Sequence, residues 1–478
     1  MRRVWLLTVM LGGLAACAVD PVTGKSTLML MSEGQEIALG EQNDQASLQH
    51  FGAYEDPELQ EWADGVGKRM AAAAERPHLP WTFRVLDDAA VNAFAGGGGY
   101  VYLTRGILAW ANSEAEIVGI LGHEIGHVTA RHIAERYTSA TLAQVGFAAG
   151  MVLSPELRSV GGELQTGLGL LLLKFSRDNE SESDRLGVGY AVGAGYDARA
   201  LAGFFTTLDR LAGPADERLP VWASTHPAPA GRAAEVLRTA TPLVADRQLQ
   251  LGRAEHLSRI DGLVFGANPR EGVVEGRTFK HPDLLFQVDF PDGWRVQNEK
   301  TIVAAMPEDG TALVALTARE RQGESLREHV AGVLEARGAV NVRGGQTTIA
   351  RAPAYWVAYN AGNESVTLGV RETFIEYEGL VYDLIGYTQD SDYARYGDRF
   401  EAYQGSFREL RRREADSYQP DRIRIVHAPR AGRFDGAVTI GPAAGIEQLA
   451  LLNGLEPGTP VQAGDPLKTI VAGYPRRQ

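Results

Sequence analysis

Two histidines and a glutamate stand at the spacing that binds and uses a catalytic metal ion. His123, Glu124 and His127 lie in the sequence His-Glu-Ile-Gly-His. On a helix, residues four apart project from one face, so both imidazoles can reach one Zn²⁺ at about 2.0–2.1 Å. Glu124 lies about 100° round the helix from His123, where it can accept a proton from water at the metal. Gly126 is expected to leave room beside the metal. The pattern predicts a zinc hydrolase; the alternative is a buried helix with two hydrogen-bonded histidines.

A catalytic zinc ion requires a third protein ligand and one open position. Glu180 and Asp184 lie in a downstream acidic run, and their spacing places both on one helix face. Glu180 could bind the metal while Asp184 accepts a hydrogen bond from a ligand imidazole. A solvated acidic helix face is the alternative. His132 falls about 180° from His123 on a continuous helix, which predicts a surface or hydrogen-bonded residue and not a ligand.

A helix and a neighbouring sheet must position these residues. The helix is predicted from Ser113, which forms a capping box with Glu116, to about Tyr137. Its apolar stripe indicates that it is buried. Strands are predicted at 81–85 and 100–104. The second strand is either a sheet edge that binds an extended peptide or an ordinary internal strand.

The N-terminus predicts export followed by lipid anchoring. A basic start and an apolar stretch too short to span a membrane precede Ala15, Ala16 and Cys17. A cysteine at this place resembles a bacterial lipobox, in which it is acylated. Residues 1–16 are therefore predicted to be a signal peptide and 17–32 a tether. The alternative is a chance cysteine after an ordinary signal peptide.

The 478 residues are enough for two or three domains. Helical periodicity over 33–260 predicts the zinc metallopeptidase domain. The strand-rich segment 279–411 has an α+β pattern with a faint resemblance to PsbP-type modules, and the tail 423–472 resembles the second half of a LysM domain. LysM domains bind cell-wall glycan, so peptidoglycan contact is possible for the tail; a small packing module is the alternative. The net charge of −13 argues against a nucleic-acid partner.

The motifs together resemble peptidase family M48, which includes HtpX, the CAAX prenyl proteases, and the Oma and BepA proteases. Besides the metal motif, segments 91–106, 195–197 and 224–227 are similar to landmarks of that family, over about residues 22–237. The resemblance implies an α+β protein with a mostly helical gluzincin domain and a small sheet. It also implies one Zn²⁺ per chain, with these residues: ligands His123, His127 and Glu180, general base Glu124, and supporting residue Asp184.

The resemblance implies a zinc metalloendopeptidase that hydrolyses unfolded or misassembled envelope proteins. Its expected place is the bacterial cell envelope, anchored through Cys17 at the periplasmic face of the outer membrane. The alternatives are a non-catalytic assembly or wall-binding lipoprotein with a vestigial metal site, and a zinc amidase of peptidoglycan. His226, in Ser-Thr-His-Pro, could stabilise the oxyanion, could fill the open metal position and keep the enzyme latent, or could have no role.

Overall fold

The computed structural model describes residues 17–141, 174–212, 221–226, 231–321, 323–362, 366–434 and 444–473. It divides into two compact units. The first is Met1–Ala267 with Asp421–Ala472, and the second is Asn268–Pro420 with Gly473–Gln478. The chain contains both helices and strands and is therefore a mixed α and β protein. The predicted signal peptide, residues 1–16, lies outside the described residues. Within the described ranges, no helix is both long and apolar enough to cross a membrane.

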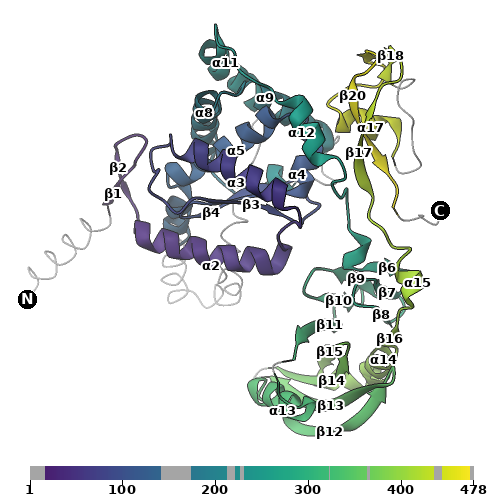
Figure 1. Ribbon diagram of the computed structural model, residues 1–478. Helices are drawn as coiled ribbons and strands as arrows, with labels where there is room; N and C mark the ends of the chain where they lie inside the picture. The colour runs from purple at the N-terminus through teal and green to yellow at the C-terminus, as the bar shows by residue number, and fades with distance from the viewer. Residues whose placement is uncertain are drawn as a thin grey trace, which may run out of the picture. The chain divides into compact units, whose positions relative to one another are not determined.

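The first unit is mostly helical and contains a small three-stranded sheet (Figure 1). Its strand order is β3-β5-β4, with β3 parallel and β4 antiparallel to β5. The strand predicted at 100–104 is therefore internal, and the interpretation of it as a sheet edge is wrong. The elements around the sheet are α2 (Glu33–Phe51), α3 (Pro57–Ala71), β3 (Thr82–Leu86), β4 (Ala93–Gly97), β5 (Tyr100–Thr104), α4 (Arg105–Trp110), α5 (Glu114–Thr129), α8 (Arg177–Gly193), α9 (Ala200–Ala212), α10 (Val221–Thr225), α11 (Arg232–Val244) and α12 (Arg253–Ile260).

The metal-motif helix is shorter than predicted. α5 begins after the N-cap Ser113, as expected, but it ends at Thr129 instead of near Tyr137. Arg131 adopts a left-handed conformation with φ of 60°, and helical residues resume only at 132–141. Arg131 is held there by Glu36, which accepts from its Nε at 3.1 Å. The chain therefore changes direction between the metal motif and His132.

The glycine run before β5 forms a turn that requires glycine. Gly97, Gly98 and Gly99 have φ values of 90°, 60° and 104°. A Cβ at Gly98 would lie 2.5 Å from the Cα of Ile37 in α2. Other residue types would thus be strained by the backbone conformation and would collide with α2.

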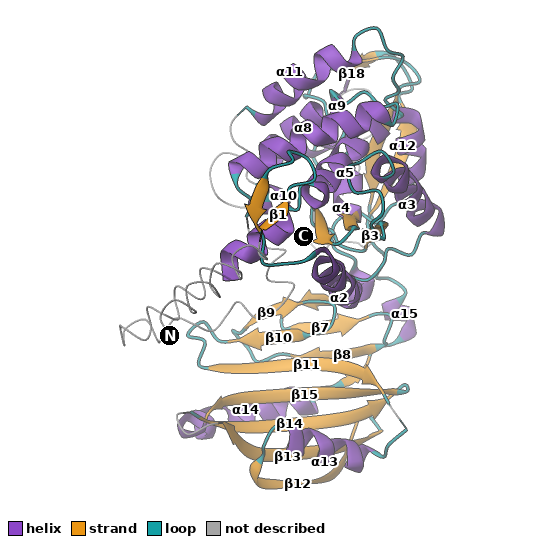
Figure 2. Ribbon diagram, turned by 90° about the vertical axis from the view of Figure 1, so that its left-hand side faces the viewer, coloured by secondary structure: helices purple, strands orange, loops and turns teal. Residues whose placement is uncertain are grey.

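The second unit is built on a seven-stranded antiparallel sheet of order β12-β13-β14-β15-β11-β10-β9 (Figure 2). α14 packs on one face through Tyr396 and Phe400, and α13 packs on the other through Val330. α14 ends at Gly405, because the chain then pairs with β8 as β16. The bounds are β6 (Val273–Glu275), β7 (Thr278–His281), β8 (Phe286–Asp289), β9 (Arg295–Asn298), β10 (Val303–Met306), β11 (Ala312–Glu320), α13 (Leu326–Ala336), β12 (Val340–Ile349), β13 (Ala352–Gly362), β14 (Thr367–Tyr377), β15 (Leu380–Gln389), α14 (Tyr393–Gly405), β16 (Arg408–Glu409) and α15 (Arg412–Ala415).

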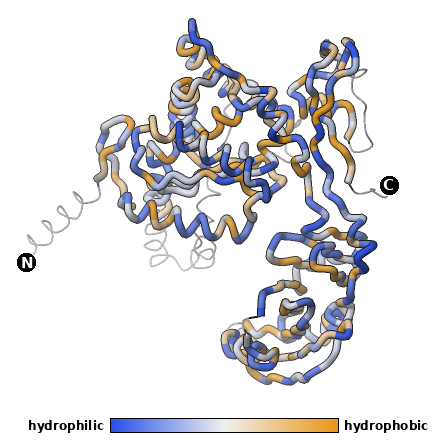
Figure 3. Tube along the Cα trace, viewed as in Figure 1, coloured by the Kyte–Doolittle hydropathy of each residue, from blue (hydrophilic) through white to orange (hydrophobic). Residues whose placement is uncertain are grey.

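The C-terminal tail packs within the first unit. β17 (Arg422–His427) pairs with β20 (Pro466–Val471), and α17 (Ile446–Leu452) lies between them in sequence. The fully buried Lys468 donates from Nζ to the carbonyls of Ala109 and Ala111, at 2.9 and 2.7 Å. Hydrophobic and hydrophilic residues alternate along the tail as along the rest of this unit (Figure 3). The tail thus shares the core of the unit that carries the metal motif.

Candidate metal centre

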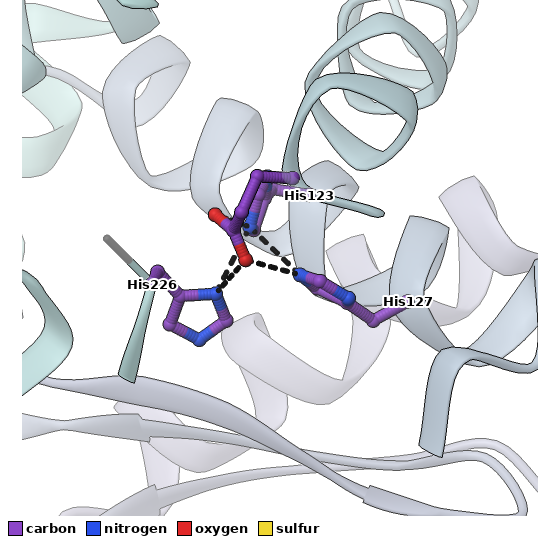
Figure 4. Close-up of side chains that lie close together, drawn as sticks. His123, His127 and His226 are labelled. Carbon is purple, nitrogen blue, oxygen red and sulfur yellow. Dashed lines mark hydrogen bonds and ion pairs between the residues drawn. The ribbon is translucent and has the colours of Figure 1, made fainter. Parts of the chain in front are cut away.

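Four buried side chains from three segments converge on one point (Figure 4). His123 and His127 come from α5, Glu180 from α8, and His226 follows α10 directly. One ligand atom from each residue lies within 4.8 Å of the other three. The predicted residues are therefore brought together, and His226 joins them through Nδ1. Pro227, part of the same sequence motif, lies outside the described residues.

The donor atoms fit a tetrahedral divalent cation. His123 Nε2 lies 3.0 Å from His127 Nε2 and 3.2 Å from His226 Nδ1. The carboxylate oxygens of Glu180 lie 3.0–3.5 Å from the three imidazoles. A tetrahedral zinc ion with bonds of about 2.0–2.1 Å separates its ligand atoms by about 3.3–3.4 Å. Three imidazoles and one carboxylate therefore match Zn²⁺ in both chemistry and size.

Two of these groups, His127 and Glu180, have pKa values that favour the deprotonated form that binds a metal, whereas the hydrogen bond to Asp184 and the nearby carboxylates outweigh burial and raise the pKa of His123. Burial lowers the pKa of His127 well below its usual value, so its imidazole is neutral. Burial opposes ionisation of Glu180, but the nearby imidazoles of His226 and His123 outweigh it and hold the pKa of the carboxyl far below its usual range. Metal ligands must be deprotonated, and both groups meet that condition.

Glycines at the crossing of α5 and α8 bring the ligands together. A Cβ on Gly122 would lie 2.7 Å from the carbonyl oxygen of Gly187, and one on Gly187 would lie 2.7 Å from the backbone nitrogen of His123. A Cβ on Gly126 would lie 3.0 Å from the Cα of Ser183. The expectation that Gly126 leaves room beside the metal is therefore corrected: its missing side chain makes room for α8.

Asp184 lies behind the cluster, on the far side of a ligand ring. Its Oδ1 is 2.9 Å from Nδ1 of His123. Arg232, at the start of α11, donates from Nε and a terminal nitrogen to both oxygens of Asp184, at 2.8 and 2.6 Å. Its other terminal nitrogen lies 2.9 Å from Glu180 Oε2. Arg232 could not be identified from a local sequence pattern, because it stands 48 residues beyond Asp184.

Trp222 contacts the predicted general base, Glu124, and is a second site residue that was not predicted from the sequence. Its indole Nε1 donates to Glu124 Oε1 at 3.2 Å. The other oxygen of Glu124 is buried and has no hydrogen-bond partner among the described residues. Trp222 stacks on His226 with ring centroids 4.9 Å apart, and its backbone N–H donates to the carbonyl of Val91 at 3.1 Å. The only indication of Trp222 in the sequence was its position, as an aromatic residue four positions before His226 of the Ser-Thr-His-Pro motif.

Comparisons with known proteins agree with this geometry. Residues 57–240 match the model of peptidase family M48. The chain is 29% identical to the beta-barrel assembly-enhancing protease of Escherichia coli (strain K12) over 47% of each chain. It is 32% identical to the mitochondrial metalloendopeptidase OMA1 of Arabidopsis thaliana, over 39% of this chain and 38% of that one. The chain thus spans less than half of the length of these relatives.

A solved structure of cyanobacterial PsbP (CyanoP) from Synechocystis sp. PCC 6803 is also similar. It is 11% identical and covers 29% of this chain and 95% of its own length, with a TM-score of 0.24. The matched segment 57–240 contains the metal-motif helix, the third carboxylate and the following histidine. The similarity to peptidase family M48 therefore covers all the residues of the candidate metal centre.

Proposed function

We propose that this chain is a zinc metalloendopeptidase. The observation that carries the proposal is the buried group His123, His127, Glu180 and His226, with Glu124 next to it on the same helix as two of the ligands. Bound there, a zinc ion would polarise a peptide carbonyl and acidify water. His123, His127 and Glu180 would hold the metal, and His226 would occupy the position that substrate and water need.

Glu124 acts as general base in this proposal. Its buried Oε2 has no hydrogen-bond partner among the described residues, so it is available to accept a proton from the attacking water. The same carboxyl then delivers the proton to the nitrogen of the leaving peptide. Asp184 fixes the ring of His123 through Nδ1, and Arg232 fixes Asp184 through two hydrogen bonds.

The described conformation represents a latent state of the enzyme. His226 Nδ1 lies among the proposed metal ligands and Trp222 donates to Glu124 Oε1, so one short segment occupies both the fourth metal position and one oxygen of the base. In the same segment, the backbone N–H of Trp222 donates a hydrogen bond to the carbonyl of Val91, which lies just before the edge strand β4. An extended peptide that adds to this edge would have to displace it.

The decisive test of the proposed reaction is the Glu124→Gln variant. It should retain zinc and the fold but lose nearly all peptide hydrolysis, because the amide cannot accept the proton. Casein digestion by the wild type, with and without a chelator, provides the reference, and metal analysis shows whether the variant is loaded. Undiminished hydrolysis by zinc-loaded Glu124→Gln would contradict the proposal.

The substrates that we propose are unfolded or misassembled proteins of the bacterial envelope. The name of the Escherichia coli relative, a beta-barrel assembly-enhancing protease, supports a role in envelope protein quality control. Residues 279–411 and 423–472 are proposed as a PsbP-like and a LysM-like module, the latter a candidate for contact with peptidoglycan.

Lipid anchoring through Cys17 would place the enzyme at the periplasmic face of the outer membrane. Cys17 is the single cysteine of the chain and follows two alanines, as a lipobox requires. Two or more acyl chains give a stable anchor, so the wild type should sediment with membranes and Cys17→Ser should be released. Full membrane retention of Cys17→Ser, measured by fractionation, would show that the anchor is another feature.

A further inference from the structure

His132 lies directly behind the metal ligand His127. Its Nδ1 is 3.0 Å from Nδ1 of His127, and the two ring centroids are 5.1 Å apart. On the far side, its Nε2 is 3.4 Å from an oxygen of Glu182. The side chain is 2% exposed, so the predicted hydrogen-bonded role is found and the surface role is not.

This contact exists because α5 stops before His132. On a continuous helix His132 would point about 180° away from His123. The left-handed Arg131 breaks the helix and turns the chain, so that His132 comes back toward the metal cluster. The break and the contact are therefore one feature of the structure.

A cation bound at this site would fix the direction of each hydrogen bond between His127, His132 and Glu182. His127 faces the cluster with Nε2, which needs a free lone pair to bind a cation, so its proton is on Nδ1. That N–H can donate only to a nitrogen lone pair on Nδ1 of His132. His132 then carries its own proton on Nε2, facing Glu182. The hydroxyl of Ser183 lies 3.3 Å from Nδ1 of His132 and is a second polar group at that nitrogen.

The two ligand histidines thus have different supports. His123 is held by the Asp184 carboxylate, itself fixed by Arg232, whereas His127 is held by the imidazole of His132. Outer hydrogen-bond acceptors orient a ligand ring and raise its basicity. We infer that His132 is the positioning residue of His127, with Glu182 supporting it, and that it sets the zinc affinity of the proposed site.

The test uses substitutions that separate hydrogen bonding from volume. In His132→Asn, the side-chain oxygen takes the place of Nδ1 and can accept from His127; in His132→Leu, no acceptor remains. His132→Leu should bind zinc about 10–100-fold more weakly than the wild type, the range for outer partners of a ligand. His132→Asn should recover most of this loss. Affinities are measured by competition with a chromophoric chelator, and Co²⁺ absorption spectra report the geometry of the site.

Glu182→Leu keeps the inference testable if His132→Leu does not fold, because the Glu182 side chain is 23% exposed. It should also weaken zinc binding, by less than His132→Leu does. Wild-type affinity in Glu182→Leu and His132→Leu would overturn the inference, as would a His132→Asn protein no tighter than His132→Leu. The inference rests on the proposed zinc site. Failure of the wild type to bind zinc would overturn both, whereas wild-type binding without any effect of these variants would overturn the inference alone.

Discussion

The His226 side chain could act in two ways, as a fourth metal ligand that inhibits the enzyme or as a hydrogen-bond donor to the oxyanion. Its removal would change the rate of hydrolysis in opposite directions in the two cases. Its Nδ1 lies 3.0 Å from Glu180 and 3.2 Å from His123, which places it among the candidate metal ligands. Its Nε2 lies 3.6 Å from Glu124. As a fourth ligand it excludes the water that hydrolysis needs. As a donor to the oxyanion it would assist the reaction after moving off the metal.

We expect His226→Ala to retain or increase peptide turnover at matched zinc content. Removing the fourth ligand opens the metal to water, and no group that the reaction requires is lost. A lost oxyanion donor would instead lower kcat by about 10²–10³-fold, or about 2.7–4 kcal/mol. Turnover of purified proteins decides between the two, with His78→Ala, at an exposed histidine of the same unit, as control. A hundredfold fall confined to His226→Ala would exclude the latch.

Residues could be predicted from the sequence where a local spacing encodes their chemistry. His123, Glu124 and His127 follow from one helical turn, and Glu180 with Asp184 from another. Trp222 and Arg232 could not be predicted, because their partners Glu124 and Asp184 are 98 and 48 residues away. Their roles depend on how α10 and α11 pack, which no short pattern encodes.

At the scale of elements, the crossing of α5 and α8 determines the geometry of the site. The two helices approach so closely that backbone atoms of one contact backbone atoms of the other at Gly122 and Gly187. α5 supplies His123 and His127, and α8 supplies Glu180 and Asp184. The distance between the helices therefore sets the distance between the imidazoles and the carboxylates.

Gly187→Ala should separate these helices and weaken both folding and zinc binding. Its Cβ would lie 2.7 Å from the His123 nitrogen and 2.9 Å from the carbonyl carbon of Gly122, and backbone atoms cannot rotate away. We expect a loss of about 1–3 kcal/mol, typical of overpacking, together with reduced zinc content. Gly189→Ala is the matched control on α8, because nothing lies within 4 Å of the added carbon, and it should gain up to about 1 kcal/mol. Equal melting temperatures for the two variants would refute the packing argument.

Element boundaries were predictable where caps stand in the sequence and not where the backbone conformation is unusual. Ser113 is the N-cap of α5 in the structure, as predicted. The end of α5 was missed because Arg131 is an ordinary helix-forming residue that tertiary contacts hold at a positive φ. β12 was missed because Gly344 and Gly345 interrupt its strand pattern.

At the scale of the whole molecule, the tail is joined to the metal-binding unit by a contact that spans 359 residues of sequence. Lys468 reaches the carbonyls of Ala109 and Ala111, just before the N-cap of α5. Asn453 holds the backbone of Lys468 on both sides, accepting at 2.7 Å and donating at 2.9 Å. The resemblance of the tail to a small separate module gave no indication of this contact, because it depends on a single buried side chain.

Lys468→Met should destabilise the metal-binding unit although it lies far from the metal in sequence. Burial lowers the pKa of Lys468 well below its usual value, and even a neutral amine can donate to two carbonyls. Methionine fills a similar volume but leaves both buried carbonyls without this donor, at a cost of about 1–3 kcal/mol. Lys68→Met is the control: its surface pair with Asp64 is half exposed and should contribute about 0–1 kcal/mol.

The pH dependence of stability separates a buried lysine from a simple packing effect. The folded-state pKa of Lys468 is depressed below the unfolded value of 10.5, so the unfolded chain binds more protons in that interval. The free energy of unfolding should therefore rise as pH increases from about 8 toward 10 in the wild type. Lys468→Met should lose this component of the slope, whereas Lys68→Met should keep it. Chemical denaturation of the full chain at several pH values measures the slope. A slope in Lys468→Met equal to that of the wild type would show that Lys468 does not change its protonation on folding.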